Sequence, residues 1–171
     1  GSPRRTHQEL STIIYTSGTT GMPKGVMHTF GGMASGAGQA STLYELSSRD
    51  RLLSYLPLSH VAERMCVELV QIYQGTHVFF ADSLDTFAQD LQRCRPTVFF
   101  AVPRIWAKFQ SGIFAKMPEE KLKKMFRVPI LNKIIKRKIV QGLGLDYWRY
   151  ALSGAAPISQ DLLNWYKSVG L

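Results

Sequence analysis

Short apolar runs alternate along the chain with stretches whose apolar residues recur at helical spacing. The runs are rich in β-branched and aromatic residues and end near Gly or Pro, which is typical of buried strands. This pattern predicts strands at residues 11–18, 51–58, 76–81, 96–103 and 148–157. The stretches between them predict helices at residues 25–44, 60–75, 83–95, 104–117, 131–144 and 159–171.

The alternation of strands and helices predicts an α/β fold with a mainly parallel sheet and flanking helices, because parallel strands need crossover connections. Ligands of such folds bind beyond the carboxyl ends of the strands. Three loops that follow predicted strands are therefore of interest: the loop after Tyr15, residues 57–60 and residues 153–157. The helix at residues 25–44 is rich in Gly, which requires another element to pack very close to it.

The composition predicts one ordinary folded domain, since 45% of the 171 residues are hydrophobic. We expect a flexible terminus at residues 1–11, where the first Gly-Ser resembles a cloning scar, followed by domain residues 12–171. No apolar run reaches the roughly 18 residues that span a bilayer, and the terminus lacks a signal-peptide core. The two separated cysteines, Cys66 and Cys94, predict reduced thiols rather than a metal site. These features together predict a cytoplasmic protein.

The stretch YTSGTTGMPKG, residues 15–25, combines glycines, hydroxyl side chains and one lysine. Glycines let backbone N–H groups approach an anion, and hydroxyls add neutral donors. The Lys24 ammonium suits a phosphate, and a hydroxyl such as that of Thr16 suits Mg²⁺. The spacing is not that of the P-loop, in which Gly-Lys-Ser/Thr follows Gly and four residues. The composition predicts a polyphosphate-binding loop.

The same stretch resembles the phosphate-binding motif of the adenylate-forming (AMP-binding) superfamily, which includes acyl-CoA synthetases, peptide-synthetase adenylation domains and luciferases. LPLSHVAE, residues 56–63, is similar to a second motif of the superfamily, and LSGAAPIS, residues 152–159, is similar to its adenine-pocket stretch. The segment SYLPLSHVAERM is most like the long-chain fatty acyl-CoA synthetase branch.

The resemblance implies that ATP and a fatty acid form an acyl-adenylate and pyrophosphate, after which CoA takes the acyl group. It implies catalytic roles for Lys24 and for His60, at the gate position near the acyl tunnel, with Thr16 as a Mg²⁺ ligand. It implies that the β- and γ-phosphates are oriented by Ser17, Gly18, Thr19, Thr20, Gly21 and Lys24. The adenine would be flanked by Gly154, Ala155, Ala156 and Pro157.

Members of the superfamily are longer and carry a downstream Tyr-Gly-x-Thr-Glu motif that has no match in this sequence. We therefore expect a central fragment of the large N-terminal domain, inactive as a ligase by itself. Two alternatives remain open. The parent is a different adenylate-forming ligase, for an aryl, short-chain or amino acid, or the isolated piece is a non-catalytic nucleotide-binding module.

The formal net charge of +9 is uneven, because residues 116–138 carry nine Lys and Arg against Glu119 and Glu120, or seven of the nine net charges. This stretch has three interpretations: a solvated helix face, a peripheral contact with the inner membrane surface, or an attraction for the CoA phosphates. Leu131, Ile134, Ile135 and Ile139 are expected on one side of its helix. No nucleic-acid-binding motif accompanies the charge, so we predict no nucleic-acid partner.

Overall fold

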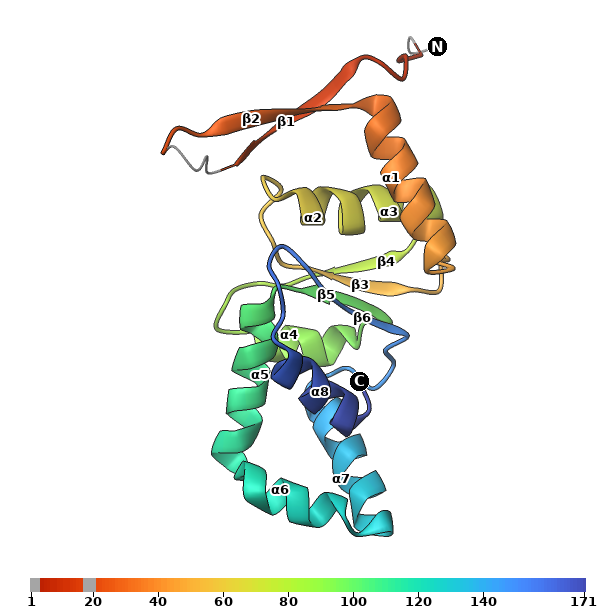
Figure 1. The fold of residues 1–171 in the computed structure, drawn as a ribbon. Coiled ribbons are helices and arrows are strands. Elements are labelled where there is room, and N and C mark those ends of the chain that lie inside the picture. The colour runs from red at the N-terminus through yellow and green to blue at the C-terminus, as the bar shows by residue number, and fades with distance from the viewer. Residues whose placement is uncertain (1–3, 17–20) are drawn as a thin grey trace. The chain divides into compact units, whose positions relative to one another are not determined.

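The computed structural model describes residues 4–16 and 21–171 (Figure 1). The chain divides into two compact units, Gly1–Phe80 and Ala81–Leu171. Each unit contains one pair of parallel strands with helices, and the first also carries a β-hairpin. The strand–helix–strand units confirm the α/β class.

The first unit begins with an antiparallel hairpin of β1 (Leu10–Thr16) and β2 (Lys24–Thr29). This corrects one prediction, because residues 25–29 are strand rather than the start of a helix. The physical reason lies in Thr29, whose Oγ1 accepts a hydrogen bond from Gly32 N–H at 3.1 Å. That bond caps a helix that starts only at Phe30 and leaves the preceding residues extended.

Helix α1 (Phe30–Leu43) has small residues where other side chains approach its backbone. A Cβ built on Gly36 would collide with the Met65 side chain, and one on Gly38 would lie 3.5 Å from the Tyr73 hydroxyl oxygen. The α1 helix packs against the helices that contain Met65 and Tyr73. Another element therefore packs very close to this Gly-rich helix, as its sequence predicted.

Strands β3 (Arg51–Ser54) and β4 (His77–Phe80) pair in parallel, with Leu52 opposite Val78. The helical connection between them consists of α2 (Val61–Glu63), the π-helical segment η1 (Arg64–Leu69) and α3 (Val70–Gln74). It ends at Gly75, whose φ of 68° is the left-handed conformation that glycine supplies at helix ends. This arrangement confirms the two strands and the helix predicted at residues 51–81.

The second unit pairs β5 (Val98–Ala101) in parallel with β6 (Tyr150–Ser153). Five helices belong to it: α4 (Phe87–Cys94), α5 (Pro103–Lys116), α6 (Glu119–Phe126), α7 (Pro129–Gly142) and α8 (Gln160–Val169). Its core holds an aromatic cluster in which Trp106 contacts Phe99 edge-on at 5.4 Å and Tyr166 at 5.0 Å, between ring centroids. Tyr166 donates a hydrogen bond to the Trp106 carbonyl at 2.6 Å, and burial raises the pKa of its hydroxyl.

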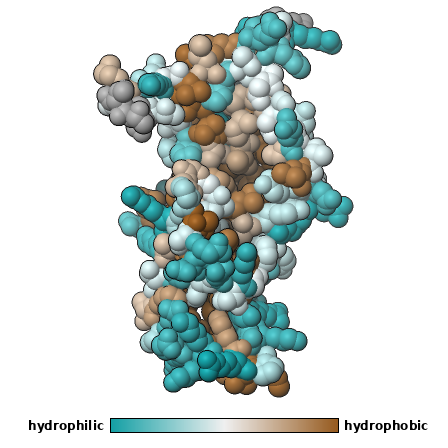
Figure 2. Space-filling view, in the orientation of Figure 1, coloured by the Kyte–Doolittle hydropathy of each residue, from teal (hydrophilic) through white to brown (hydrophobic). Residues whose placement is uncertain are grey.

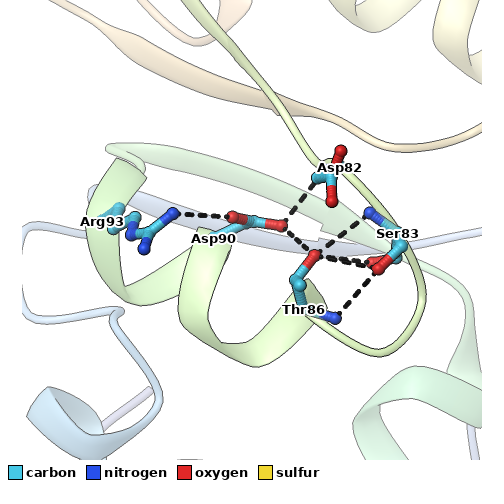
Figure 3. Close-up of polar contacts among 5 residues, drawn as sticks. All are labelled: Asp82, Ser83, Thr86, Asp90 and Arg93. Atoms are coloured by element: carbon cyan, nitrogen blue, oxygen red, sulfur yellow. Dashed lines mark hydrogen bonds and ion pairs between the residues drawn. The ribbon is translucent and has the colours of Figure 1, made fainter.

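A polar network precedes α4 (Figure 3). The Asp90 carboxylate accepts hydrogen bonds from Thr86 Oγ1 at 2.7 Å and from Asp82 N–H at 3.1 Å. Ser83 and Thr86 bond to each other, and Thr86 is the N-cap residue of α4 without a capping bond from its side chain. These hydrogen bonds lower the pKa of Asp90, and the bond from Thr86 has the largest effect.

Within the described residues, no helix is both long enough and apolar enough to cross a bilayer. Neither Cys66 nor Cys94 forms a disulfide, which agrees with the expected thiols.

Candidate functional site

Thr16 and Lys24, which flank the central part of the predicted phosphate loop, lie at one end of the β1–β2 hairpin (Figure 1). Thr16 and Lys24 face each other as the last described pair of the hairpin. The Thr16 hydroxyl donates to the Lys24 carbonyl oxygen across a 3.5 Å separation, and both residues are exposed. The hairpin therefore fixes the two ends of the loop side by side. Ser17, Gly18, Thr19 and Thr20 lie outside the described residues.

Two glycines of this stretch have identifiable roles. Gly21 has φ of 82°, the left-handed region that other residues rarely adopt. A Cβ on Gly25 would come within 2.8 Å of Ile13 Cγ2 on the neighbouring strand. The Ile13 side chain therefore requires a residue without a Cβ at position 25. Lys24 makes no ion pair with any residue in the described part of the chain, and its side chain is exposed to solvent. The ammonium is thus available to an anion at the hairpin end.

His60 ends the loop after β3 and starts α2. Its Nδ1 accepts a hydrogen bond from the Ala62 N–H at 3.1 Å, which is an N-capping interaction. Because Nδ1 is the acceptor, the proton of the neutral imidazole lies on Nε2. The His60 N–H also donates to the Pro57 carbonyl at 2.8 Å, which closes the loop as a turn. The half-buried imidazole is held in one orientation with Nε2 as its donor.

Glu63 and Arg64, which the sequence analysis did not single out, hold this loop. The Glu63 carboxylate, 2% exposed, accepts hydrogen bonds from Ser54 Oγ at 2.5 Å and from Leu56 N–H at 3.2 Å. Arg64 Nε donates to the Leu58 carbonyl at 3.1 Å. The carboxylate and the guanidinium therefore bind both halves of the loop that leads to His60. The only sequence signal was their position directly after the HVA of the second motif.

The helix behind this loop is irregular, since η1 has π-helical geometry from Arg64 to Leu69. Such segments are rare and occur often at functional sites. Cys66 lies within it, and the pKa of its thiol is raised, mainly by burial and further by the nearby Glu63 carboxylate. A raised pKa disfavours the thiolate, which is the nucleophilic form of cysteine.

The predicted adenine stretch follows β6 in the second unit. A Cβ on Gly154 would come within 2.8 Å of the Phe100 ring, so packing against the neighbouring strand requires glycine there. Ala155 has φ of 66°, an uncommon conformation for a residue with a Cβ. Ala155, Ala156 and Pro157 are exposed. The loop presents a short surface of small side chains.

The structure thus brings together Thr16 and Lys24, and it gives His60 a fixed orientation in the same unit. No described hydrogen bond joins His60 to the hairpin. Gly154 to Pro157 belong to the second unit. Among the described residues, no group of three His, Cys, Asp or Glu side chains is placed to hold a metal ion.

These features define an α/β protein whose first hairpin flanks a glycine- and hydroxyl-rich stretch of sequence. The chain belongs to the AMP-binding enzyme family, whose pattern it matches over residues 2–171. It is 36% identical over 195 aligned residues to the long-chain-fatty-acid–CoA ligase ACSBG2 of Xenopus laevis. That alignment covers 95% of this chain and 26% of the relative, so the chain spans about a quarter of the relative's length.

Two solved structures show the same fold. The adenylation domain of a carboxylate reductase from Mycobacterium chelonae has a TM-score of 0.73 and 26% identity, covering 98% of this chain and 26% of that one. O-succinylbenzoate coenzyme A synthetase from Bacillus subtilis, in complex with AMP, has a TM-score of 0.66 and 26% identity, covering 96% and 29%. This chain therefore has the fold of part of an adenylate-forming enzyme domain, as the resemblance implied.

Proposed function

We propose that the chain acts within an ATP-dependent, AMP-forming acid–thiol ligase whose acid is a long-chain fatty acid and whose thiol is CoA. The observation that carries this proposal is the stretch of residues 15–25, in which Thr16 and Lys24 are joined as one hairpin pair. Similarity to ligases named for long-chain fatty acids supports the choice of acid and thiol.

The reaction has two steps, and the hairpin acts in the first. The fatty-acid carboxylate attacks the α-phosphorus of ATP, and the bond to pyrophosphate breaks. The Lys24 ammonium neutralises charge on the β- and γ-phosphates, so that pyrophosphate can leave. Because Lys24 begins a paired strand, its backbone is fixed before ATP arrives, and little ordering is needed on binding.

The exposed Thr16 hydroxyl fits a Mg²⁺ site in which most of the ligands are phosphate and water oxygens, which is how Mg²⁺ is commonly held. When bound, this ion would reduce the negative charge of the phosphates. Thr16 contributes one neutral oxygen to such a site. No cluster of acidic side chains among the described residues competes with it for the role.

His60 and the loop after β6 act on the other parts of the substrates. The His60 Nε2–H donates to the carboxylate or to a phosphate oxygen and orients the acid for attack. Gly154 to Pro157 offer small side chains and backbone to the flat adenine ring. In the second step the CoA thiol attacks the acyl carbon, and AMP leaves as the acyl–phosphate bond breaks.

The test measures ATP–pyrophosphate exchange with a long-chain fatty acid, in the ligase that we propose contains this chain. Lys24→Ala should lower the exchange rate by about 100-fold or more, because an oriented charge at the leaving group is lost. The matched control is Lys108→Ala, which removes an exposed lysine of α5. Equal rates in the wild type and in Lys24→Ala would overturn the proposal.

A second measurement uses the 171-residue chain itself. We expect it to bind MgATP in a calorimetric titration without releasing pyrophosphate, and we expect Lys24→Ala to weaken that binding. If the ligase catalysed ATP–pyrophosphate exchange with an aryl or short-chain acid but not with a fatty acid, the adenylation step would be supported and the proposed substrate class would be wrong.

A further inference from the structure

Helix α7 has apolar side chains in the middle of its solvent face. Ile130 is 76% exposed and Ile134 is 47% exposed, one helical turn apart, and Val128 just before the helix is 50% exposed. Ile134 is expected on one side of the helix together with Leu131, Ile135 and Ile139, and it does not lie in the buried interior. The inner face is instead formed by Ile135 and Val140, both buried.

Basic residues border this apolar strip on both sides. With about 3.6 residues per turn, Lys133 and Arg137 lie on one side of Ile130 and Ile134, and Lys138 lies on the other. All three are exposed, and α7 contains no Asp or Glu. An apolar strip flanked by long cationic side chains is typical of a helix that lies in the surface of a membrane.

The corner between α6 and α7 holds this strip in place. Asn132 Nδ2 donates to the Phe126 carbonyl at 2.8 Å, and Lys136 Nζ lies 5.4 Å from the centroid of the Phe126 ring. Leu122 of α6 is buried. The two acidic residues of α6, Glu119 and Glu120, form ion pairs with Lys123. Figure 2 shows hydrophilic residues around a small hydrophobic group over this corner of the second unit.

A basic pocket adjoins the Lys133–Arg137 side of the strip. It has a volume of about 500 Å³, and its lining includes Arg95, Lys133, Lys136 and Arg137 against one carboxylate, that of Asp146. Asp146 is bound by Arg95, whose Nε donates to Oδ1 at 3.0 Å. The other three cations give the pocket a net positive charge, which suits a phosphate group.

We propose that the outer face of α7 is a docking surface for a membrane that contains anionic phospholipid. Val128, Ile130 and Ile134 enter the boundary between headgroups and acyl chains, and Lys133, Arg137 and Lys138 contact lipid phosphates. The basic pocket accepts a headgroup phosphate beside the apolar strip. The positive charge of this face favours an anionic membrane over a second copy of the chain, because two copies of the face would bring like charges together.

The docking surface extends the proposed function, since a fatty acid partitions into membranes, but its test does not depend on ligase activity. The 171-residue chain is sedimented with vesicles of phosphatidylcholine, with and without phosphatidylglycerol, at low and at physiological salt. We expect binding only to the anionic vesicles, and weaker binding as salt is added.

Two variants separate the contributions. Ile130→Ser with Ile134→Ser should weaken binding by at least tenfold, because the apolar insertion is lost while the net charge is unchanged. Lys133→Gln with Arg137→Gln and Lys138→Gln should weaken it by about 100-fold, since each cation near an anionic surface contributes about a fivefold effect. All five positions are exposed or half-exposed, so circular dichroism should show an unchanged fold.

Matched controls use exposed positions elsewhere. Leu84, 82% exposed, is replaced by Ser, and Arg49, Lys108 and Lys167 are replaced together by Gln, which removes the same net charge as the α7 charge variant. Neither control should change binding. The proposal is overturned if anionic vesicles do not bind the chain at low salt, or if the charge control weakens binding as much as the α7 variant does. It is also overturned if glycerol phosphate alone abolishes vesicle binding, or if the isoleucine variant alters only self-association.

Discussion

The buried Glu63 carboxylate accepts a 2.5 Å hydrogen bond from Ser54 Oγ, and this joins the end of strand β3 to the helix that follows His60. The residues between them form the loop that leads to His60. The carboxylate accepts a second bond from Leu56 N–H, so the loop has few ways to move independently of the helix. The position of His60 therefore depends on the buried carboxylate of Glu63.

Replacement of Glu63 should destabilise the first unit and displace His60. Glu63→Ala leaves the Ser54 hydroxyl and the Leu56 N–H without their acceptor, at a cost of about 2–4 kcal/mol in the free energy of unfolding. Glu63→Gln keeps one acceptor oxygen and should recover part of this loss. Urea unfolding of both variants measures the effect.

If Glu63 positions His60, its replacement should also change the kinetics of the proposed ligase. In the proposed ligase, Glu63→Gln should lower kcat for adenylation at a temperature at which the variant is fully folded, with a smaller change in the KM for ATP. Glu68, half-exposed and paired with Arg64, is the control carboxylate. Glu68→Gln should have the kinetics of the wild type. If Glu63→Gln also had the kinetics of the wild type, the position of the loop would not depend on Glu63.

The Asp90 network makes stability depend on acid pH. Its hydrogen bonds lower the pKa of Asp90 from the ordinary value of 3.8, so the ionised form is favoured in the folded state. The resulting stability is complete above that ordinary value and is lost as the pH falls through the lowered folded pKa. Asp90→Asn should therefore be less stable than the wild type at neutral pH, and the difference should shrink below pH 3.8.

Denaturant unfolding between neutral and strongly acidic pH tests this directly. Asp161 is a suitable control because it is an exposed acid in the first turn of another helix, α8. A difference between wild type and Asp90→Asn that stayed constant across the whole pH range would show that the carboxylate charge contributes nothing.

Periodicity was sufficient for the strands β3 to β6 and for most helices, because those elements bury apolar residues at regular intervals. It failed at residues 25–29, where the deciding interaction is the bond from Gly32 N–H to Thr29 Oγ1. At these residues the sequence pattern was ambiguous, and a local contact decided the structure.

The candidate site was visible in the sequence through its motifs, whereas its support was not. Thr16, Lys24 and His60 were found because glycines, hydroxyls and a histidine stand in a characteristic order. Glu63 was missed because one of its partners is a backbone N–H, which every residue except proline carries. Such contacts become evident only when the loop is folded back onto the helix.

Gly144 and Gly142 form a matched pair for testing backbone constraints near α7. Gly144 has φ of 73°, and a Cβ there would lie 2.6 Å from Leu91 O and from Gln92 Cα. Gly144→Ala should destabilise the second unit by roughly 3 kcal/mol, because both the conformation and the contact are unfavourable. Gly142, at the end of α7, has no atom within 4 Å of a built Cβ. Gly142→Ala should leave stability unchanged or raise it by up to about 1 kcal/mol. Thermal unfolding of the two variants gives the comparison, and equal melting temperatures would contradict it.

Gly154 and Phe100 test whether the small residues of the predicted adenine loop serve packing, ligand binding or both. Gly154→Ala brings a methyl group to within 2.8 Å of the Phe100 ring and should cost about 1–3 kcal/mol of stability. Phe100→Leu should relieve this collision, so the double variant should be more stable than the sum of the single effects predicts. If the loop also binds adenine, MgATP affinity should stay reduced in the double variant even after its stability is regained. Restored affinity would assign Gly154 to packing alone, because the added methyl group would then not interfere with the nucleotide.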